Sequence, residues 1–521
     1  AHQNTGVGRN ALKDNTTGEY NTALGVNALE GNTTADYNTA VGYFALDANT
    51  TGTENVAVGA LALDASTTAS YNTALGYNAL TANTTGTENT ALGNRSLDAN
   101  TTGSNNVAIG QAALTNATTA DSNTAVGDDA LEANTTGDLN TAVGKDCLAA
   151  NTTGTLNTAV GYRALDSNTT GSQNVAIGLN ALNNNTTASN NTAVGYQSLN
   201  GNTAANNTAV GYNSLVANTS GEQNVAVGAF TLDQNTTADY NTAIGYNSMG
   251  DNTTGTQNTA VGHRSLKSNS TANNNTAVGY HALEENTTGT DNTAVGSNAL
   301  QAATAASNNT AIGDVSLGSN TSGADNTAVG ASCLSANTSG NFNTAIGCRS
   351  LNNNTTGTGL CAVGEDALLN NTTGTQNNAM GQSALRAHTT GNYNVAIGAN
   401  SLATNTSASN NTAVGHSTLN ANTSGTNNVA VGYFALDSNT TGVQNVAVGS
   451  TALQLNTTGS ENTGIGQEAL DHVTTGSMNI GIGEKGGYTI TSGSTNIAIG
   501  VQAARNLTTG SNNVFVGVDA I

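Results

Sequence analysis

The chain has 521 residues, of which 62 are Gly, none is Pro or Trp and only 4% are aromatic. Charged residues make up 8% and leave a formal net charge of −22, with 33 acidic residues against 11 basic ones. This balance excludes a basic nucleic-acid binder, and no apolar run reaches the roughly 18 residues of a membrane helix. Four Cys exclude a dense disulfide framework, whereas the scarcity of bulky apolar residues is by itself typical of disorder.

A repeat of 17 residues accounts for this composition. N-T-A-V-G or a close variant begins at Asn4, recurs every 17 residues to Asn191, loses one residue before Asn207 and continues to Asn513. That gives 30 full repeats and a partial one, with the consensus N-[TV]-A-[VI]-G-Y-N-A-L-x-x-N-T-T-G-x-x. We number these positions as columns 1 to 17. Column 5 is Gly in all 31 repeats, column 1 is Asn in 30, and column 9 is Leu in 27.

Each repeat predicts two short strands followed by a turn. The N-T-A-V-G run alternates like a strand, with columns 2 and 4 on one face and columns 1, 3 and 5 on the other. The A-L pair of columns 8 and 9 fits a second short strand, and N-T-T-G supplies turn residues. We therefore expect an all-β chain, a parallel β-solenoid (β-roll) of about thirty 17-residue coils.

Stacking of the coils is essential to this interpretation. One coil buries about one Val and one Leu, worth roughly 1.5–3 kcal/mol each, against about 1–2 kcal/mol of backbone entropy for every ordered residue. We expect strands to pair between coils at roughly 4.8 Å, with hydrogen-bonded ladders of the Asn in columns 1 and 12 and the Thr in column 13. About thirty such coils predict a rod of roughly 145 Å.

The regularity of the repeat divides the chain into residues 1–478, which form regular coils, and residues 479–521, expected to be irregular terminal coils of the same solenoid. In the second segment Gly481 replaces the column 3 Ala, Gly487 replaces Leu, and Phe515 brings a ring into column 3. Because the chain begins close to a repeat and ends within one, we expect it to continue end to end or into flanking domains outside this segment.

Column 3 leads us to expect association between chains. It is Ala in 27 of 31 repeats and lies opposite the Val of column 4 on the strand. With Asn in column 1 and Gly in column 5 it gives a strip of small residues, represented by Ala40, Ala57, Ala74 and Ala91. We expect this strip to be buried between chains of a homotrimer. The alternative is a solvent-facing strand, which would vary more and carry charge.

Acidic residues favour column 10, where Glu30, Asp47 and Asp64 follow one another in consecutive coils. Such a row could hold a divalent cation, which needs clustered oxygens. A solvated acidic edge that keeps the protein soluble is the interpretation we favour. We therefore predict no metal, cofactor or catalytic residue.

Tyr gathers in columns 6 and 17, on either side of the N-T-A-V-G strand. The candidates for stacking on surface glycans are Tyr43, Tyr77, Tyr196 and Tyr212. Rings at such positions more often pack along their neighbours and shield strand ends.

Enzymatic motifs are missing from the pattern. The Gly positions form no phosphate loop, and no nucleophile elbow surrounds any Ser. No two of Cys147, Cys333, Cys348 and Cys361 share a column in neighbouring coils. We interpret the Cys as small residues rather than as disulfide partners.

The N-[TV]-A-[VI]-G runs resemble the S-V-A-I-G repeats in the head of trimeric autotransporter adhesins. They resemble still more the N-T-A-[IV]-G…A-L…N-T-T-G repeats of bacterial surface proteins and phage tail fibres. The resemblance covers residues 4–521 and implies a left-handed parallel β-roll in each chain. It also implies three parallel chains, intertwined or side by side around one axis, and an adhesive or spacer role.

These observations predict a non-enzymatic extracellular fibre, a homotrimeric rod that projects from a cell or virion surface and mediates attachment, with surface glycans as candidate partners. This segment is expected neither to bind nucleic acid nor to insert into a membrane. One alternative is a phage tail fibre or virion appendage built from the same repeat. Another is an ice- or surface-binding solenoid, for which column 13 offers a row of Thr.

Overall fold

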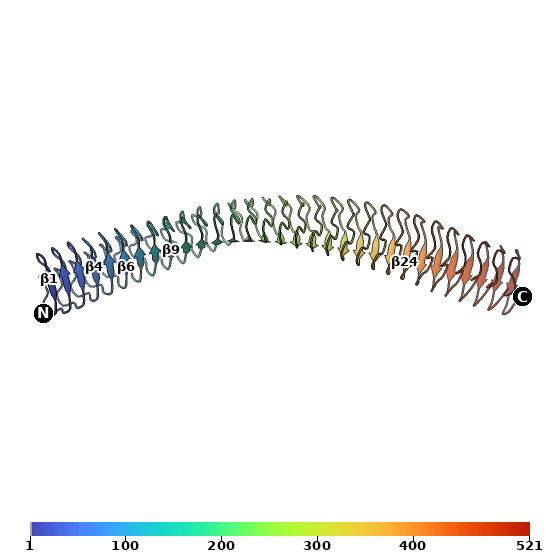
Figure 1. The fold of residues 1–521 in the computed structure, drawn as a ribbon, viewed down its shortest axis with the longest axis horizontal. Coiled ribbons are helices and arrows are strands. Elements are labelled where there is room, and N and C mark those ends of the chain that lie inside the picture. Colours follow the sequence, from blue (N-terminus) through green and yellow to red (C-terminus); the bar gives the residue numbers. More distant parts are fainter. Residues whose placement is uncertain (1–2) are drawn as a thin grey trace. The chain divides into compact units, whose positions relative to one another are not determined.

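The computed structural model describes residues 3–521 and divides the chain into two compact units, one ending at Gln257 and the other beginning at Asn258. Each unit is a parallel β-solenoid with one three-residue strand in every coil (Figure 1), which confirms the predicted fold class. Among residues 3–521 no helix occurs, and so none that could serve as a membrane span.

The strands recur at the coil spacing throughout each unit. In the first unit they are β1 Thr5–Val7, β2 Thr22–Leu24, β3 Thr39–Val41, β4 Val56–Val58, β5 Thr73–Leu75, β6 Thr90–Leu92, β7 Val107–Ile109, β8 Thr124–Val126, β9 Thr141–Val143, β10 Thr158–Val160, β11 Val175–Ile177, β12 Thr192–Val194, β13 Thr208–Val210, β14 Val225–Val227 and β15 Thr242–Ile244. In the second they are β16 Thr259–Val261, β17 Thr276–Val278, β18 Thr293–Val295, β19 Thr310–Ile312, β20 Thr327–Val329, β21 Thr344–Ile346, β22 Cys361–Val363, β23 Asn378–Met380, β24 Val395–Ile397, β25 Thr412–Val414, β26 Val429–Val431, β27 Val446–Val448, β28 Thr463–Ile465, β29 Ile480–Ile482, β30 Ile497–Ile499 and β31 Val514–Val516.

Within each unit, successive strands pair in parallel and residues of one column lie opposite one another. In β2 and β3, for example, Ala23 pairs with Ala40 and Leu24 with Val41. The one-residue deletion before Asn207 does not disturb this register, because Thr192 still pairs with Thr208. The shorter coil is therefore accommodated outside the strand.

The A-L pair does not form the expected second strand. Columns 7, 9 and 17 adopt left-handed backbone conformations, with φ of 59° at Asn27 and 55° at Leu29. These conformations turn the chain and interrupt strand alternation. A left-handed residue costs roughly 1–2 kcal/mol, which the complete burial of Leu29 offsets by about 1.5–3 kcal/mol. Hydrogen bonds still join these turns, since the Leu29 N–H donates to the Ala45 carbonyl at 3.0 Å.

The invariant Gly of column 5 is explained by close contact between coils. A Cβ at Gly42 would lie 2.3 Å from the carbonyl oxygen of Gly59 in the next coil. The φ of 143° at Gly42 is also strained for any residue with a side chain. Every coil therefore requires Gly at this point.

The core of each coil consists of columns 1, 3, 8, 9, 12 and 15. Ala40, Ala45 and Leu46 are completely buried, so the prediction of a buried Leu is confirmed. Columns 2 and 4 share a face as predicted, but it is the outer one, and Leu24 in column 4 is 48% exposed. The expectation that column 4 fills the core was wrong because alternation groups residues by face without saying which face is inside.

The predicted strip of small residues is likewise misplaced. Ala40, Ala57, Ala74 and Ala91 are completely buried within their own chain, so they cannot form a strip that is buried between chains. The reason is the column 9 Leu: at Gly464, a column 3 position, an added Cβ would lie 3.3 Å from the Leu453 side chain. Column 3 is small because it packs under Leu.

Two ladders of buried Asn join the coils, as predicted. In column 1, the Asn38 N–H donates to Asn21 Oδ1 at 2.9 Å, and its own amide donates to the Gly52 carbonyl. In column 12, the Asn49 amide donates to Asn32 Oδ1 at 3.0 Å and to the same Gly52 carbonyl. The two ladders therefore meet at the turn and close each coil.

A third ladder runs along column 13, again as predicted. The Thr33 hydroxyl donates to the Thr50 carbonyl at 3.0 Å, and Thr50 donates in turn to Thr67. These hydroxyls are thus already engaged in bonds between coils.

The column 12 ladder is interrupted where another residue replaces Asn. At four such points the preceding coil keeps an Asn whose buried Oδ1 has no partner, whereas before Ala303 the Asn286 Oδ1 accepts a hydrogen bond from the Gly289 N–H. The replacements and the Asn that they leave unpartnered are Ser66 after Asn49, Ala117 after Asn100, His388 after Asn371 and Val473 after Asn456.

Residues 479–521 keep the strand register despite their irregular sequence, and Ile480 pairs with Ile497. Gly487 occupies the column 9 position with a φ of 68°. Ile490 fills the column 12 position and is completely buried. Phe515 packs against the buried cluster of Ala498, Ala503 and Ala504. The residues of the core therefore change in this segment, whereas the strand register of the coils stays the same.

Candidate association surface

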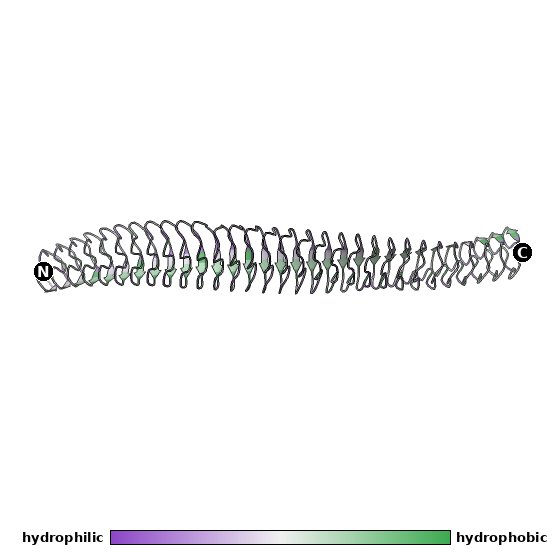
Figure 2. Ribbon diagram, turned by 90° about the horizontal axis from the view of Figure 1, so that it is seen from above, coloured by the Kyte–Doolittle hydropathy of each residue, from purple (hydrophilic) through white to green (hydrophobic). Residues whose placement is uncertain are grey.

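The outer strand face, formed by columns 2 and 4, carries an aliphatic side chain or Met in every coil, exposed in some coils and half-buried in the others. Figure 2 shows green strand ribbons recurring along each unit. The most exposed members of column 4 are Val7, Leu24, Leu75, Leu92, Val143, Ile177 and Ile244 in the first unit and Ile312, Ile346, Met380, Ile397, Val431, Val448, Ile465, Ile482, Ile499 and Val516 in the second. Their pairing in register gives column 4 a regular aliphatic row within each unit.

This outer strand face also lacks charge. Neither column 2 nor column 4 contains Asp, Glu, Lys or Arg in any of the 31 repeats, although the chain has a net charge of −22. A strand face that meets only water usually carries charged residues, which also protect against unwanted association. The pattern of columns 2 and 4 is therefore that of a surface which contacts another protein surface.

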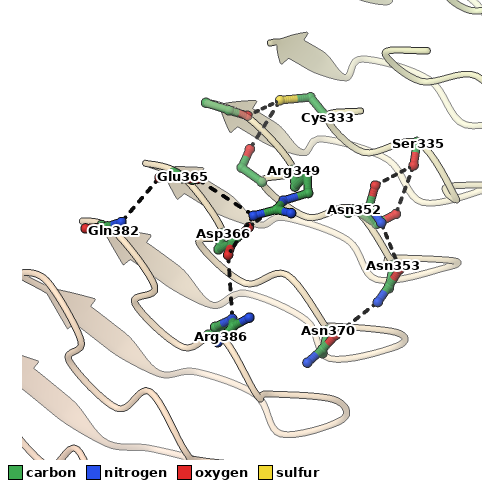
Figure 3. Close-up of polar contacts among 12 residues, drawn as sticks. Cys333, Ser335, Arg349, Asn352, Asn353, Glu365, Asp366, Asn370, Gln382 and Arg386 are labelled. Carbon is green, nitrogen blue, oxygen red and sulfur yellow. Dashed lines mark hydrogen bonds and ion pairs between the residues drawn. The ribbon is translucent and has the colours of Figure 1, made fainter. Parts of the chain in front are cut away.

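The charged residues gather on the turns of columns 6 to 11 instead. Figure 3 shows such a cluster, in which Arg349 binds Asp366 at 2.8 Å and Arg386 approaches the same carboxylate at 3.6 Å. Arg349 also lies 3.7 Å from Glu365. Exposed ion pairs of this kind contribute about 0–1 kcal/mol, so the cluster orders the turn without determining the fold.

The four Cys are free thiols in different surroundings. Cys147 and Cys333 are buried small residues as interpreted from the sequence, and burial raises the pKa of Cys147 to about 12. Cys333 Sγ lies 3.5 Å from the Ser350 hydroxyl. Cys348 is exposed, whereas Cys361 lies half-buried on the outer strand face in β22.

The acidic row of column 10 is a set of neighbouring carboxylates without the geometry of a cation site. Lys13 binds Glu30 at 2.8 Å. Burial, reinforced by neighbouring carboxylates, raises the pKa of Asp47 to about 6, and burial also raises that of Asp64. Among residues 3–521, no three His, Cys, Asp or Glu side chains are grouped so as to hold a metal ion. The cation interpretation therefore has no support.

Neighbouring coils explain why column 10 is unfavourable for an ionised carboxylate. In several coils a donor in column 10 bonds to the column 7 carbonyl of the preceding coil. Thr115 Oγ1 donates in this way to the Arg95 carbonyl at 2.8 Å, and the Asn183 amide donates to the Arg163 carbonyl at 3.0 Å. An ionised Asp has no hydrogen to offer at this position.

The tyrosines proposed from the sequence are all exposed, but they are arranged differently. Tyr196 and Tyr212 stack on each other, with ring centroids 5.1 Å apart and planes 9° apart. Tyr43 makes an edge contact with Phe44 at 4.4 Å, and Tyr77 is 55% exposed. Stacked rings cover the faces that a sugar would contact, so the first pair fits the role of shielding its neighbours.

The sequence interpretation missed the outer strand face. The complete absence of charge from columns 2 and 4 could have identified this face in the sequence. The small residues of column 3 led instead to the prediction that column 3 forms the contact between chains. The chain matches no protein-family model, and no curated protein shows significant similarity to it.

Proposed function

We propose that this chain is a non-enzymatic structural and adhesive fibre outside the cell, formed by three parallel copies that pack through their outer strand faces. One observation carries the proposal: columns 2 and 4 lie on the outer face of the strand and never carry a charge in an acidic chain, and column 4 is aliphatic or Met in every repeat. The number of copies and the extracellular location follow the resemblance to the repeats of trimeric adhesin heads and of bacterial surface proteins.

The energetics favour a long, in-register contact. A Val or Ile that passes from about 40% exposed to buried contributes about 1 kcal/mol. One coil would not overcome the cost of association, which is on the order of 4–15 kcal/mol. Because the same contact recurs in each coil, many coils together exceed that cost. Association of this kind requires parallel copies whose coils are aligned.

A phage tail fibre or virion appendage would use the same contact, and it stays an alternative identity for the same rod. The ice-binding alternative is less well supported. Its candidate Thr row, exemplified by Thr33 and Thr50, lies in the turn and already donates hydrogen bonds between coils.

The first test is the mass of the native protein, measured by native mass spectrometry and sedimentation. Three chains of 51.6 kDa are expected. A cooperatively folded monomer would overturn the proposal, and two or four chains would overturn the stoichiometry alone. Replacing Val261, Val278 and Val295 of column 4 by Glu should dissociate the assembly. The control places Glu at Asn274 and Asn308 of column 17, and this variant should keep the native mass.

Cys361 offers a test of parallel alignment. In a Cys348→Ser background, a short bis-maleimide should join Cys361 to Cys361 of another copy, because both would lie on the contact face at the same coil. The reverse background, Cys361→Ser with the exposed Cys348 retained, should give labelled but unjoined chains. Joining through Cys348 alone would place the contact on the turns and contradict the proposal.

A further inference from the structure

Column 17 of the first unit carries a short row of exposed side chains: Tyr20, Tyr37, Glu54 and Tyr71. All four residues have the same left-handed backbone, with φ between 58° and 64°, so their side chains leave the coils in a common direction. The rings of Tyr20 and Tyr37 lie 4.8 Å apart with planes 2° apart. These two rings are therefore nearly parallel and are separated by the distance between neighbouring coils.

Glu54 interrupts this row, and because its side chain is shorter than that of Tyr, it leaves a gap above its carboxylate between two rings. Tyr71 follows Tyr37 by two coils, and two spacings of 4.8 Å separate such rings by about 9.6 Å. An open cavity of about 400 Å³ is lined by Tyr37 and Glu54. Tyr37 and Tyr71 are 56% and 54% exposed, so the gap faces solvent.

The charge in this gap is negative. The Glu54 carboxylate is exposed and makes no ion pair or hydrogen bond within the described part of the chain. The neighbouring positions of columns 16 and 17 add Glu19, Asp36 and Glu88. Asp36 is already engaged, since it accepts a hydrogen bond from the Glu19 N–H at 2.6 Å. Glu54 therefore presents an uncompensated negative charge beside an aromatic ring.

We propose that Tyr37, Glu54 and Tyr71 bind a trimethylammonium group. A cation above the Glu54 carboxylate and beside the Tyr37 ring would lie within the roughly 6 Å over which a cation and an aromatic face attract. A rounded, methylated cation fills a gap of this width better than a flat ring does. The carboxylate favours a positive ligand over a neutral sugar.

This site goes beyond the proposed fibre function and does not depend on it. All three residues belong to one chain and to coils close to one another, so binding is expected whether or not copies associate. Measuring the native mass of every variant alongside its binding keeps failure of the site distinct from failure of the assembly.

The test is a ligand-observed NMR titration of the full chain with choline. We expect Tyr37→Leu, Tyr71→Leu and Glu54→Gln each to weaken binding by about 3–30-fold, in keeping with one lost cation–π or charge contact. Leu and Gln occur naturally in column 17 at Leu139, Leu156 and Gln173, so these variants should fold. The neutral isostere 3,3-dimethylbutan-1-ol should bind far more weakly.

The matched control is Tyr240→Leu. Tyr240 is an equally exposed ring in the same column and unit, but its column neighbours are Gln223 and Gln257 instead of Glu and Tyr. This variant should bind choline as well as the unaltered chain does. Equal binding of the neutral isostere, or an equal loss in Tyr240→Leu, would overturn the proposal.

Vesicles distinguish the source of the ligand. Binding to phosphatidylcholine vesicles but not to phosphatidylglycerol vesicles would assign a lipid head group. Binding to choline without binding to either vesicle would assign a soluble or peptide-borne trimethylammonium group. Binding to neither choline nor phosphatidylcholine would overturn the site.

Discussion

The inner and outer faces of the same three-residue strand follow different rules. On the inner face, column 3 is Ala in 27 of 31 repeats and is completely buried in nearly all of them. On the outer face, columns 2 and 4 exchange Thr, Val, Ile, Leu, Cys, Asn and Met, yet never admit a charge. The inner face requires particular residues because its side chains pack under the column 9 Leu, where an added Cβ at Gly464 would lie 3.3 Å from Leu453. The outer face requires only that its residues carry no charge.

This comparison also shows how so small a core can suffice. Each coil buries two Ala and one Leu, exemplified by Ala40, Ala45 and Leu46, together with two Asn. Hydrogen bonds between coils, repeated at Asn38 and Asn49, supply order that apolar volume cannot. Substitutions on the inner face should therefore be costly, and those on the outer face should matter mainly for association.

The largest difference between the faces is expected at column 5. In Gly279→Ala, the new Cβ would lie 2.3 Å from the Gly296 carbonyl, so we expect a loss of more than about 3 kcal/mol in local stability. Thr276→Ala in column 2 of the same coil should cost less than about 1 kcal/mol. Hydrogen exchange read by mass spectrometry compares the two in one peptide. Similar losses in both variants would contradict the division into an inner and an outer face.

A smaller effect, a gain in local stability, is expected when the Asn ladder is restored at His388. Its Nε2 lies 2.8 Å from the Gly391 carbonyl, and its buried Nδ1 and Asn371 Oδ1 have no partner. His388→Asn should restore the ladder to both neighbouring coils and raise local stability by about 1–2 kcal/mol. Ala117→Asn in the same column lies between Asn100 and Asn134, should give a similar gain and serves as the control.

The two repairs should differ in their pH dependence. Burial lowers the pKa of His388, so the folded state holds fewer protons than the unfolded one. The contribution of His388 to the free energy of unfolding is therefore lost as the pH falls below about 6.5, the ordinary pKa of His. His388→Asn should abolish this loss, whereas the gain from Ala117→Asn should not depend on pH.

The smallest effect on stability is expected at Asp47 in column 10, and its pH dependence is opposite to that of His388. Its pKa is raised from 3.8 to about 6, so the folded state holds the extra proton. The stability of this coil should fall as the pH rises from about 4 to 6 and then level off. Asp47→Asn should therefore be neutral at pH 4 and stabilising at pH 7, by up to about 1 kcal/mol after allowance for solvent screening.

Asp98 is the control for Asp47. It occupies the same column but is paired with Arg95 at 3.2 Å, so Asp98→Asn should give no gain at pH 7. Hydrogen exchange of the peptides around residues 47 and 98, at pH 4 and pH 7, measures both. A gain at Asp98 equal to that at Asp47 would show that the arginine does not determine the difference.

The sequence was a good guide to residues that contact their own copies in the next coil. Asn38, Asn49 and Leu46 were placed correctly because repetition exposes any position that must match at every coil. It was a poor guide to the turn around Leu46, since alternating left-handed residues leave no strand or helix pattern. Among the candidate ligands, the spacing of column 6 separates the two pairs: Tyr196 and Tyr212 lie in consecutive coils and stack, whereas Tyr43 and Tyr77 lie two coils apart.

The sequence by itself determined the period, the parallel register and the ladders, because all three follow from identical residues recurring 17 apart. Only the tertiary structure decided which face of the strand is inside. Ala40 is small enough to face either a neighbouring chain or its own core, and Val41 is apolar enough for either place. The turn of columns 6 to 11 made this choice. It brings Leu46 back over columns 1 and 3 of the strand and leaves columns 2 and 4 outside.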